Sequence, residues 1–387
     1  MSVTAAAGFV AAGIHCGVKP PPAADLALVA TADGRAVPAA AVFTSNLAAA
    51  APVLVSRRHL HDSASRAAAV VINSGNANAA TGATGLEHAE STCAWVADRL
   101  GCGAEEVVVC STGLIGIPLP IAAIEAGVGR VVEGLSPAGG ADAATAIMTT
   151  DTRRKEVVVT AGSISVGGMA KGAAMLAPDM ATMLAILTTD AEVGPPTLRA
   201  ALGAAVADSF NALIVDGCTS TNDTVVVLAS GRAGPPAPGQ LEGALAEACA
   251  DLAAQMAADA EGATLVARLT VRGARSPADA RQAARKVAQS ALVKCSLFGR
   301  DPYWGRVVSE LGSSGAAFDP DRVSVAYGGT VVCRGGVAAG HDANKVRAHL
   351  RTATIELTAD LGLGPYEATV LATDLGPGYI DENKGTS

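Results

Sequence analysis

The sequence of 387 residues predicts an α/β protein built as two lobes. A chain of this length buries one large core or two medium ones, because single domains usually contain about 100–200 residues. Short apolar runs typical of strands alternate with helical runs along the whole chain. Half of the residues are apolar but only 3% are aromatic, so the core must consist of small aliphatic side chains and close backbone contacts.

The first predicted elements are two strands with a helix between them. Residues 67–72 are all apolar, as in a strand that is buried on both faces. Residues 87–100 carry apolar side chains at helical spacing and predict an amphipathic helix. Residues 106–110 then return to a valine-rich run, which favours a second strand.

A hairpin and a central strand follow. Residues 154–160 and 163–167 are extended runs on either side of Ala161-Gly162, which is typical of a hairpin turn. Residues 182–187 form a compact apolar run and predict a central strand. The α/β alternation therefore continues through the middle of the chain.

The next stretch repeats the alternation. Residues 197–210 predict a helix, 224–228 a strand, and 241–260 a long helix of alanines and charged side chains. Residues 230–241 are rich in proline and glycine, and we expect them to form a surface loop.

The last third returns to strands. Residues 264–271 are expected to be extended, and 277–293 to be helical with Ser276 as the N-cap. Residues 323–333 predict a hairpin about Gly328-Gly329, and 353–373 supply two more strands.

Charge and composition exclude several classes of function. The net charge of −8 and the lack of a basic stripe argue against a nucleic-acid partner, which would need clustered Lys and Arg. The first residues lack the pattern of a signal peptide, and no apolar run approaches the ~20 residues that span a bilayer. We therefore expect a cytoplasmic protein without a membrane partner.

The cysteines and histidines do not indicate a metal site, a cofactor or a catalytic triad. The eight cysteines contain no C-x-x-C pair, and neither they nor the six histidines cluster at zinc spacing. We interpret the cysteines as reduced thiols that mostly fill the core. The sequence thus predicts no metal and no cofactor.

A candidate nucleophile lies in the segment around Met180-Ala181-Thr182. Thr182 follows a small residue, so its hydroxyl has open access to the Ala181 carbonyl, and attack there followed by hydrolysis would cut the chain. The freed amine, with an ordinary pKa near ~8, would then serve as the base for the same hydroxyl. On spacing alone, however, a β-branched residue at the start of a buried strand is the simpler interpretation.

Eight segments together resemble the ornithine acetyltransferase family, also called the bifunctional ArgJ proteins, over nearly the whole chain. Each motif alone is weak, but their order and separations are those of the family. The segments are INSGNANAATG (72–82), VCSTGLIG (109–116), AIMTTDT (146–152), GGMAKGAAMLAPDMATML (167–184), DGCTSTNDT (216–224), DAEGAT (259–264), DPYWGR (301–306) and DEN (381–383).

The resemblance implies an enzyme that cuts itself between Ala181 and Thr182 into an α chain of 1–181 and a β chain of 182–387. Its fold would be the layered sheets and helices of the ornithine acetyltransferase (DmpA/ArgJ-like) fold, with the two products interleaved. Thr182 would carry the acetyl group from N2-acetylornithine to glutamate in a ping-pong cycle, and acetyl-CoA could be a second donor. The family usually assembles as a heterotetramer of two α and two β chains.

The resemblance also assigns site residues. Thr112 and Gly113 match the oxyanion hole, for which an ordinary strand-ending turn is the alternative interpretation. Lys171 matches a lysine that binds the substrate carboxylate, and Glu261 an acid suited to the ornithine cation. The further substrate-binding positions are Thr149, Thr150, Thr182, Asn383 and Ser387.

Some positions depart from the family pattern, and other activities stay open. The tail after Glu382 is one residue short and lacks the usual tyrosine, Ala174 replaces a glycine, and Tyr303 replaces an asparagine. The physiological role is arginine biosynthesis or that of a secondary-metabolite paralogue. The alternative functions are an N-terminal-nucleophile amidase or aminopeptidase, and an uncleaved, non-catalytic paralogue.

Overall fold

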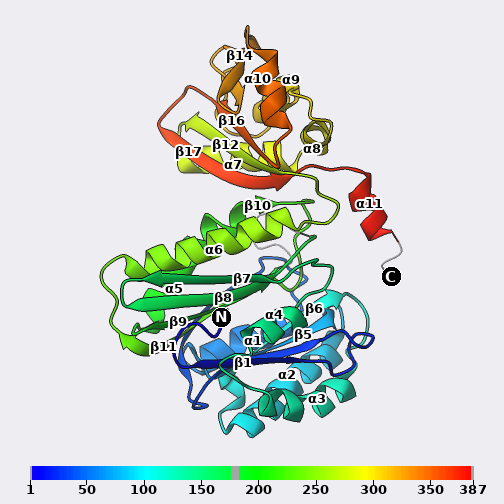
Figure 1. Ribbon diagram of the computed structural model, residues 1–387, viewed down its shortest axis with the longest axis vertical. Helices are drawn as coiled ribbons and strands as arrows, with labels where there is room; N and C mark the ends of the chain where they lie inside the picture. Colours follow the sequence, from blue (N-terminus) through cyan, green and yellow to red (C-terminus); the bar gives the residue numbers. More distant parts are fainter. Residues whose placement is uncertain (1, 176–182, 385–387) are drawn as a thin grey trace. The chain divides into compact units, whose positions relative to one another are not determined.

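The computed structural model describes residues 2–175 and 183–384 (Figure 1). The described residues form two compact units. Unit 1 contains those of Met1–Ala173, Asp179–Asn211 and Thr219–Met256, and unit 2 those of Ala174–Pro178, Ala212–Cys218 and Ala257–Ser387. The predicted α/β class with two lobes is confirmed.

Unit 1 contains two sheets. The four-stranded sheet has the order β1 (Phe9–Ile14), β2 (Leu26–Thr31), β5 (Ala69–Asn76), β6 (Val107–Leu114). The six-stranded sheet has the order β4 (Arg66–Ala67), β3 (Val37–Phe43), β11 (Thr224–Gly234), β9 (Leu184–Ala191), β8 (Ile164–Lys171), β7 (Lys155–Ala161). The two strands that follow residue 181, β11 and β9, therefore lie between strands that precede it within one sheet.

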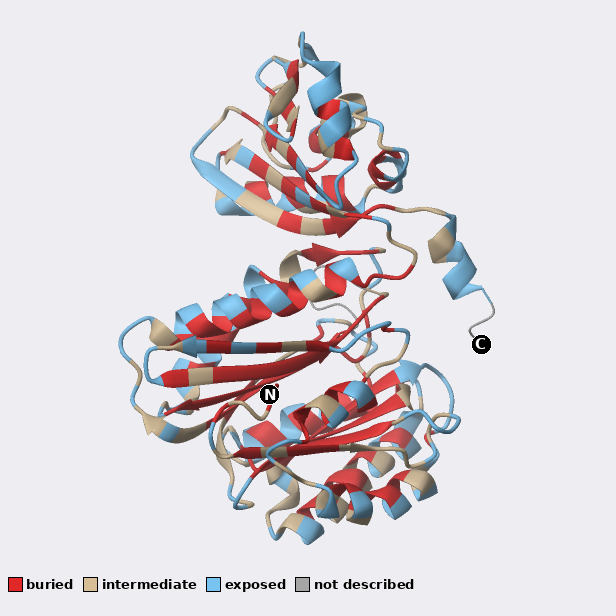
Figure 2. Ribbon diagram, in the orientation of Figure 1, coloured by how far each residue is buried: buried red, intermediate tan, exposed pale blue. Residues whose placement is uncertain are grey.

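The central strands β2, β5 and β9 of unit 1 are buried on both faces, as Figure 2 shows. Ala27 and Val29 of β2 belong to the core shared by the two sheets, together with residues of α4 (Gly140–Ala146). Leu26 and Leu28 point to the opposite face, where they pack in a second core with three helices. These helices are α1 (Ala51–Asp62), α2 (Gly82–Leu100) and α3 (Ile121–Glu133).

The outer face of the six-stranded sheet packs against α5 (Pro195–Ala207) and α6 (Gln240–Ala258). A side chain on Gly168 of β8 would meet Leu252 of α6, and Gln255 of α6 bonds the backbone of Glu156 in β7. Unit 1 is thus a four-layer structure of helices, sheet, sheet and helices. This agrees with the layered fold that the resemblance implies.

Unit 2 is built on one mixed sheet of seven strands. Its order is β10 (Leu213–Ile214), β17 (Tyr366–Thr373), β12 (Val266–Ala274), β16 (Thr354–Asp360), β13 (Ser324–Tyr327), β14 (Thr330–Arg334), β15 (Val337–Ala338). Its helices are α7 (Pro277–Gln289), α8 (Ala291–Phe298), α9 (Trp304–Gly312), α10 (Ala343–Leu350) and α11 (Pro377–Asn383). Two short 3₁₀ turns, Ala104–Glu106 and Phe210–Ala212, complete the elements of the described residues.

Most predicted elements are confirmed, with shifted ends. The hairpin of β7 and β8 turns at Gly162, and that of β13 and β14 turns at Gly328-Gly329. Ser276 caps α7, because its side chain accepts a hydrogen bond from the Asp279 N–H. In the described part of the chain, no helix is long and apolar enough to span a bilayer.

Two predictions are wrong in part. Residues 230–234 are not loop but the end of β11, where glycines at 231 and 234 take positive φ beside a register shift and let the strand continue. The helix predicted over 277–293 is two helices, because Ser290 is extended and its side chain caps α8 through the Val293 N–H. The strand predicted at 182–187 is described from Leu184 and runs to Ala191.

Candidate active site

The predicted oxyanion residues lie at the end of β6, beside the parallel strand β5. Ser74 pairs with Thr112 and Gly75 with Gly113. Thr112 is buried and Gly113 is exposed. Gly113 has φ +133°, and a Cβ there would lie 2.3 Å from the Gly75 carbonyl carbon, so only glycine fits. The end of β6 and the bend that follows it, residues 112–117, are called the oxyanion turn below; they bring the Gly113 backbone to the surface at the edge of a rigid sheet.

The asparagines near this turn hold its backbone. Asn73 donates to the Asn76 carbonyl at 2.8 Å and accepts from the Ser111 hydroxyl at 2.6 Å. Asn222 donates to the carbonyls of Ser111, at 2.9 Å, and Ala77, at 2.6 Å. The amides of Asn73 and Asn222 are thus used by the backbone of these turns.

The Thr149-Thr150 segment is fixed by the Asp151 carboxylate. One oxygen of Asp151 accepts from Lys155 Nζ at 2.6 Å and from the Gly172 N–H at 2.8 Å, and the other accepts from the Thr149 N–H at 3.0 Å. The side chains of Asp151 and Lys155 are both 0% exposed. This carboxylate therefore joins the predicted threonines to the end of β8, where Lys171 lies.

The protonation state of Asp151 follows from its neighbours. Burial alone would raise the pKa of Asp151, but the positive charges of Lys171 and Lys155 and two backbone hydrogen bonds lower it to about 2. Lys171 itself is buried at the last position of β8, opposite Leu184 of β9. Asp151 is therefore a carboxylate that faces two ammonium groups.

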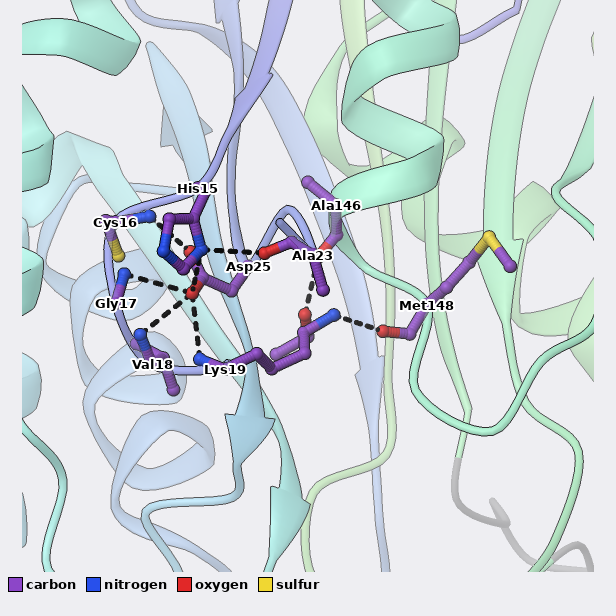
Figure 3. A network of polar contacts seen from close by, with 10 residues as sticks. His15, Cys16, Gly17, Val18, Lys19, Ala23, Asp25, Ala146 and Met148 are labelled. Carbon is purple, nitrogen blue, oxygen red and sulfur yellow. Dashed lines mark hydrogen bonds and ion pairs between the residues drawn. The ribbon is translucent and has the colours of Figure 1, made fainter. Parts of the chain in front are cut away.

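A second polar network reaches the same segment from the N-terminal side (Figure 3). The Asp25 carboxylate accepts N–H bonds from residues 16–19 at 2.6–3.1 Å. Burial would raise the pKa of Asp25, but these N–H groups lower it below its usual value. The resulting turn directs Lys19 Nζ to the Met148 carbonyl at 2.8 Å, while Ser74 bonds the Ala146 carbonyl at 2.5 Å.

Lys19 also connects this network to the oxyanion turn. A Cβ on Gly75 would lie 2.6 Å from Lys19 Cγ, so the aliphatic stem of Lys19 packs on the glycine that pairs with Gly113. Burial lowers the pKa of Lys19, the charge of Asp25 raises it, and the charge of Lys171 lowers it. Unit 1 thus brings Thr112, Gly113, Thr149, Thr150 and Lys171 to one connected set of strand ends.

Unit 2 holds the other predicted residues. Asn383 of α11 donates to the Glu261 carboxylate at 2.8 Å, and Glu261 is buried. Gly262 has φ +63°, and a Cβ there would lie 2.0 Å from the Tyr379 N, so α11 packs directly on this glycine. Glu261 and Asn383 are therefore in contact, as a shared substrate-binding role requires.

Three acidic or basic groups lie close to this pair. Tyr379 donates to Asp216 at 3.2 Å, and burial raises the pKa of Asp216 despite its hydrogen bonds. The buried Lys294 donates to the Thr373 carbonyl at 2.7 Å, and burial lowers its pKa to about 8 against the charges of Asp216 and Asp374. These groups hold α8 and α11 against β17 and the 212–218 segment of unit 2.

The sequence reasoning missed several residues of the site. Asp151 lies within the AIMTTDT motif and Asp223 within DGCTSTNDT, so both could have been found from the matched segments. Lys19, Lys155 and Tyr379 belong to no motif and show themselves only through their contacts. The predicted residues Ala181, Thr182 and Ser387 lie outside the described residues.

The layered fold and the strand-end cluster of a glycine turn, lysines and buried carboxylates define this protein as an enzyme. The family model of the ArgJ family matches residues 10–385, and the chain belongs to this family. It is therefore an acyltransferase of arginine biosynthesis, which confirms the predicted enzyme class and the family resemblance.

Relatives match along their whole lengths. The "Arginine biosynthesis bifunctional protein ArgJ" of Thermobifida fusca is 47% identical over 100% of both chains. The protein of the same name from Mycolicibacterium paratuberculosis is 49% identical over 100% of this chain and 96% of its own. A solved chain of ornithine acetyltransferase from Mycobacterium tuberculosis, complexed with ornithine, is 43% identical, with a TM-score of 0.41, and covers 46% of this chain and 94% of its own.

Proposed function

We propose that this protein is a glutamate N-acetyltransferase that cuts itself between Ala181 and Thr182 and works in the cytoplasm. The new N-terminal Thr182 then moves an acetyl group from N2-acetylornithine to glutamate. One observation carries this proposal: matched segments spread from residue 72 to residue 224 meet at the same strand ends of unit 1. Such convergence is expected of a reaction site and not of scattered surface turns.

The first half-reaction forms an ester. The neutral amine of Thr182 takes the proton of its own hydroxyl, whose oxygen attacks the acetyl carbonyl of N2-acetylornithine. The Gly113 N–H and the Thr112 hydroxyl would stabilise the negative oxygen of the tetrahedral intermediate. The intermediate collapses, ornithine leaves, and acetyl-Thr182 remains until the amine of glutamate attacks it.

The substrate contacts follow the charges. The ammonium of Lys171 would pair with the α-carboxylate of either amino acid, with Thr149 or Thr150 beside it. Glu261, held by Asn383, would meet the side-chain cation of ornithine, and Ser387 would contribute from the tail. The segments 1–181 and 182–387 are proposed to stay together as a heterotetramer of two copies each, and acetyl-CoA is proposed as a second acetyl donor.

The intact mass of the purified protein tests the cleavage. We expect two fragments, the second beginning at Thr182, in the wild type and in Thr182→Ser, which keeps a hydroxyl. Thr182→Ala should give one uncut chain of 38.1 kDa. An uncut wild type would refute the N-terminal nucleophile.

Acetyl transfer distinguishes the proposed enzyme from an amidase. With N2-acetylornithine present, added glutamate should be converted to N-acetylglutamate, and little acetate should appear without it. Release of acetate at the same rate with and without glutamate would instead identify a hydrolase.

A further inference from the structure

Asp223 is a buried carboxyl group at the start of β11, next to β9. Its side chain is 0% exposed, and one oxygen, Oδ1, accepts a hydrogen bond from the Met183 N–H at 2.9 Å. Its backbone carbonyl accepts from the Thr44 N–H at 2.9 Å, so the residue is held on both sides. Among the described residues, its second oxygen, Oδ2, has no hydrogen-bond partner.

The surroundings of Asp223 favour the neutral form of this carboxyl. Burial raises its pKa well above the usual range, although the Met183 N–H, the nearby Ser220 side chain and the positive charge of Lys171 act in the opposite direction. Since Oδ1 already accepts an N–H, the acidic proton belongs on Oδ2. Asp223 therefore presents an O–H donor for which no described residue is the acceptor.

The position of this donor is set by the covalent chain. The Met183 nitrogen belongs to the peptide bond that joins Thr182 to Met183, and consecutive Cα atoms are ~3.8 Å apart. Asp223 thus holds the backbone of the residue that directly follows Thr182, whose nitrogen must be released in the proposed cleavage. That nitrogen leaves as an amine only if it gains a proton.

We propose that Asp223 is the acid that protonates the Thr182 nitrogen when the Ala181–Thr182 bond breaks. This inference rests on the proposed self-cleavage. The Thr182 oxygen bonds to the Ala181 carbonyl carbon, the C–N bond breaks, and the nitrogen takes the proton from Asp223 Oδ2. The proton of the Thr182 hydroxyl returns to the Asp223 carboxylate, so the step moves one proton from oxygen to nitrogen. Water then hydrolyses the ester to the Ala181 carboxylate and the free hydroxyl.

Asp223→Asn separates proton transfer from hydrogen bonding. The amide keeps an oxygen for the Met183 N–H and offers an N–H where the O–H was, but it cannot give up a proton. In a time course of cell-free synthesis, followed by gel and intact mass, we expect cleavage at least about 10²-fold slower than in the wild type. Cleavage within threefold of the wild-type rate would overturn the proposal.

Asp190→Asn is the matched control. Asp190 is also a buried carboxylate on β9, and it accepts N–H bonds from Ser165 at 2.7 Å and Ala7 at 3.3 Å. This control should be cut at the wild-type rate. If Asp223→Asn does not unfold cooperatively, the pH dependence of cleavage in the wild type tests the proposal instead. The wild-type cleavage rate should fall as the pH rises, because Asp223, which lies near Lys171, then loses its proton. A rate that is flat or rises would overturn the proposal.

These results are distinguishable from a failure of the proposed function. If the wild type is never cut, the nucleophile assignment fails and takes the role of Asp223 with it. If the wild type is cut and Asp223→Asn is cut equally fast, only the assignment of the acid fails.

Discussion

Replacing Lys155 by methionine should strongly destabilise unit 1, although Lys155 belongs to none of the matched segments. Lys155 Nζ lies 2.6 Å from Asp151 Oδ1, and neither side chain has any exposed surface. Methionine has nearly the same length and keeps the packing, but it leaves the Asp151 carboxylate buried with one ammonium contact fewer. The decrease in the free energy of unfolding therefore measures the loss of the charge and not the creation of a cavity.

The size of the expected loss of stability follows from the pKa of Asp151. Its pKa falls from 3.8 to about 2, and a difference of ~1.8 units corresponds to ~2.4 kcal/mol at neutral pH. Breaking a buried pair by removing one partner typically costs about 3–5 kcal/mol. Because Lys171 and two N–H groups still act on Asp151, we expect the free energy of unfolding to fall by about 3 kcal/mol.

Urea unfolding at pH 7 measures this loss, with Arg154→Met as the matched control. Arg154 is the preceding residue, and its pair with Glu156, at 3.2 Å, is partly exposed, so its loss should cost less than about 1 kcal/mol. Adding Asp151→Asn to Lys155→Met should recover part of the loss, because no buried charge then remains. Equal effects of Lys155→Met and Arg154→Met, or strict additivity in the double variant, would refute the reasoning.

The same carboxylate predicts the pH dependence. The folded-state pKa of Asp151 is lowered, so its contribution is fully present above ~4 and is lost as the pH falls toward 2. Wild-type stability should therefore decline over this range more steeply than that of Asp151→Asn. Parallel declines in the two proteins would show that other carboxyls dominate acid unfolding.

Three further outcomes are expected in kinetics of acetyl transfer. Gly113→Ala should lower kcat by about 10²–10³, because its Cβ would lie 2.3 Å from the Gly75 carbonyl carbon; an unchanged kcat would exclude the oxyanion role. Lys19→Met should raise KM about tenfold and kcat less, because the Met148 carbonyl loses its 2.8 Å contact; an unchanged KM would count against this positioning role. Glu261→Gln should raise KM for N2-acetylornithine more than for glutamate, because the lost charge faces a cation; equal changes would contradict that contact.

Elements with strong local signals were predictable from the sequence, and small-residue elements were not. The β7–β8 hairpin is marked by alternating residues around Gly162, and α2 by its apolar stripe. By contrast, β3 reads VPAAAVF and α4 reads GADAATA, and neither has a clear period. Alanine is compatible with helix, strand and loop alike, so these elements are decided by the core between the two sheets.

The site divides in the same way. Motifs located Thr112, Gly113 and Lys171, because their residue types carry the expected chemistry and their order is that of the family. The burial of Lys155 could not be predicted from the residues next to it in the sequence, since a lysine in a charged stretch is usually exposed. It becomes visible only when β7 and β8 pair and the Asp151 segment folds over them.

Asp151 and Asp223 show why such residues matter together. Both carboxyls are buried and both feel the charge of Lys171, yet the pKa of Asp151 is lowered to about 2 and that of Asp223 is raised, because only Asp151 also bonds Lys155. The raised pKa of Asp223 favours its neutral form, so this carboxyl adds no negative charge beside Lys171, which favours a negatively charged oxygen of substrate or intermediate there. An ionised Asp223 would place a negative charge beside Lys171, so its protonation serves binding as well as proton transfer.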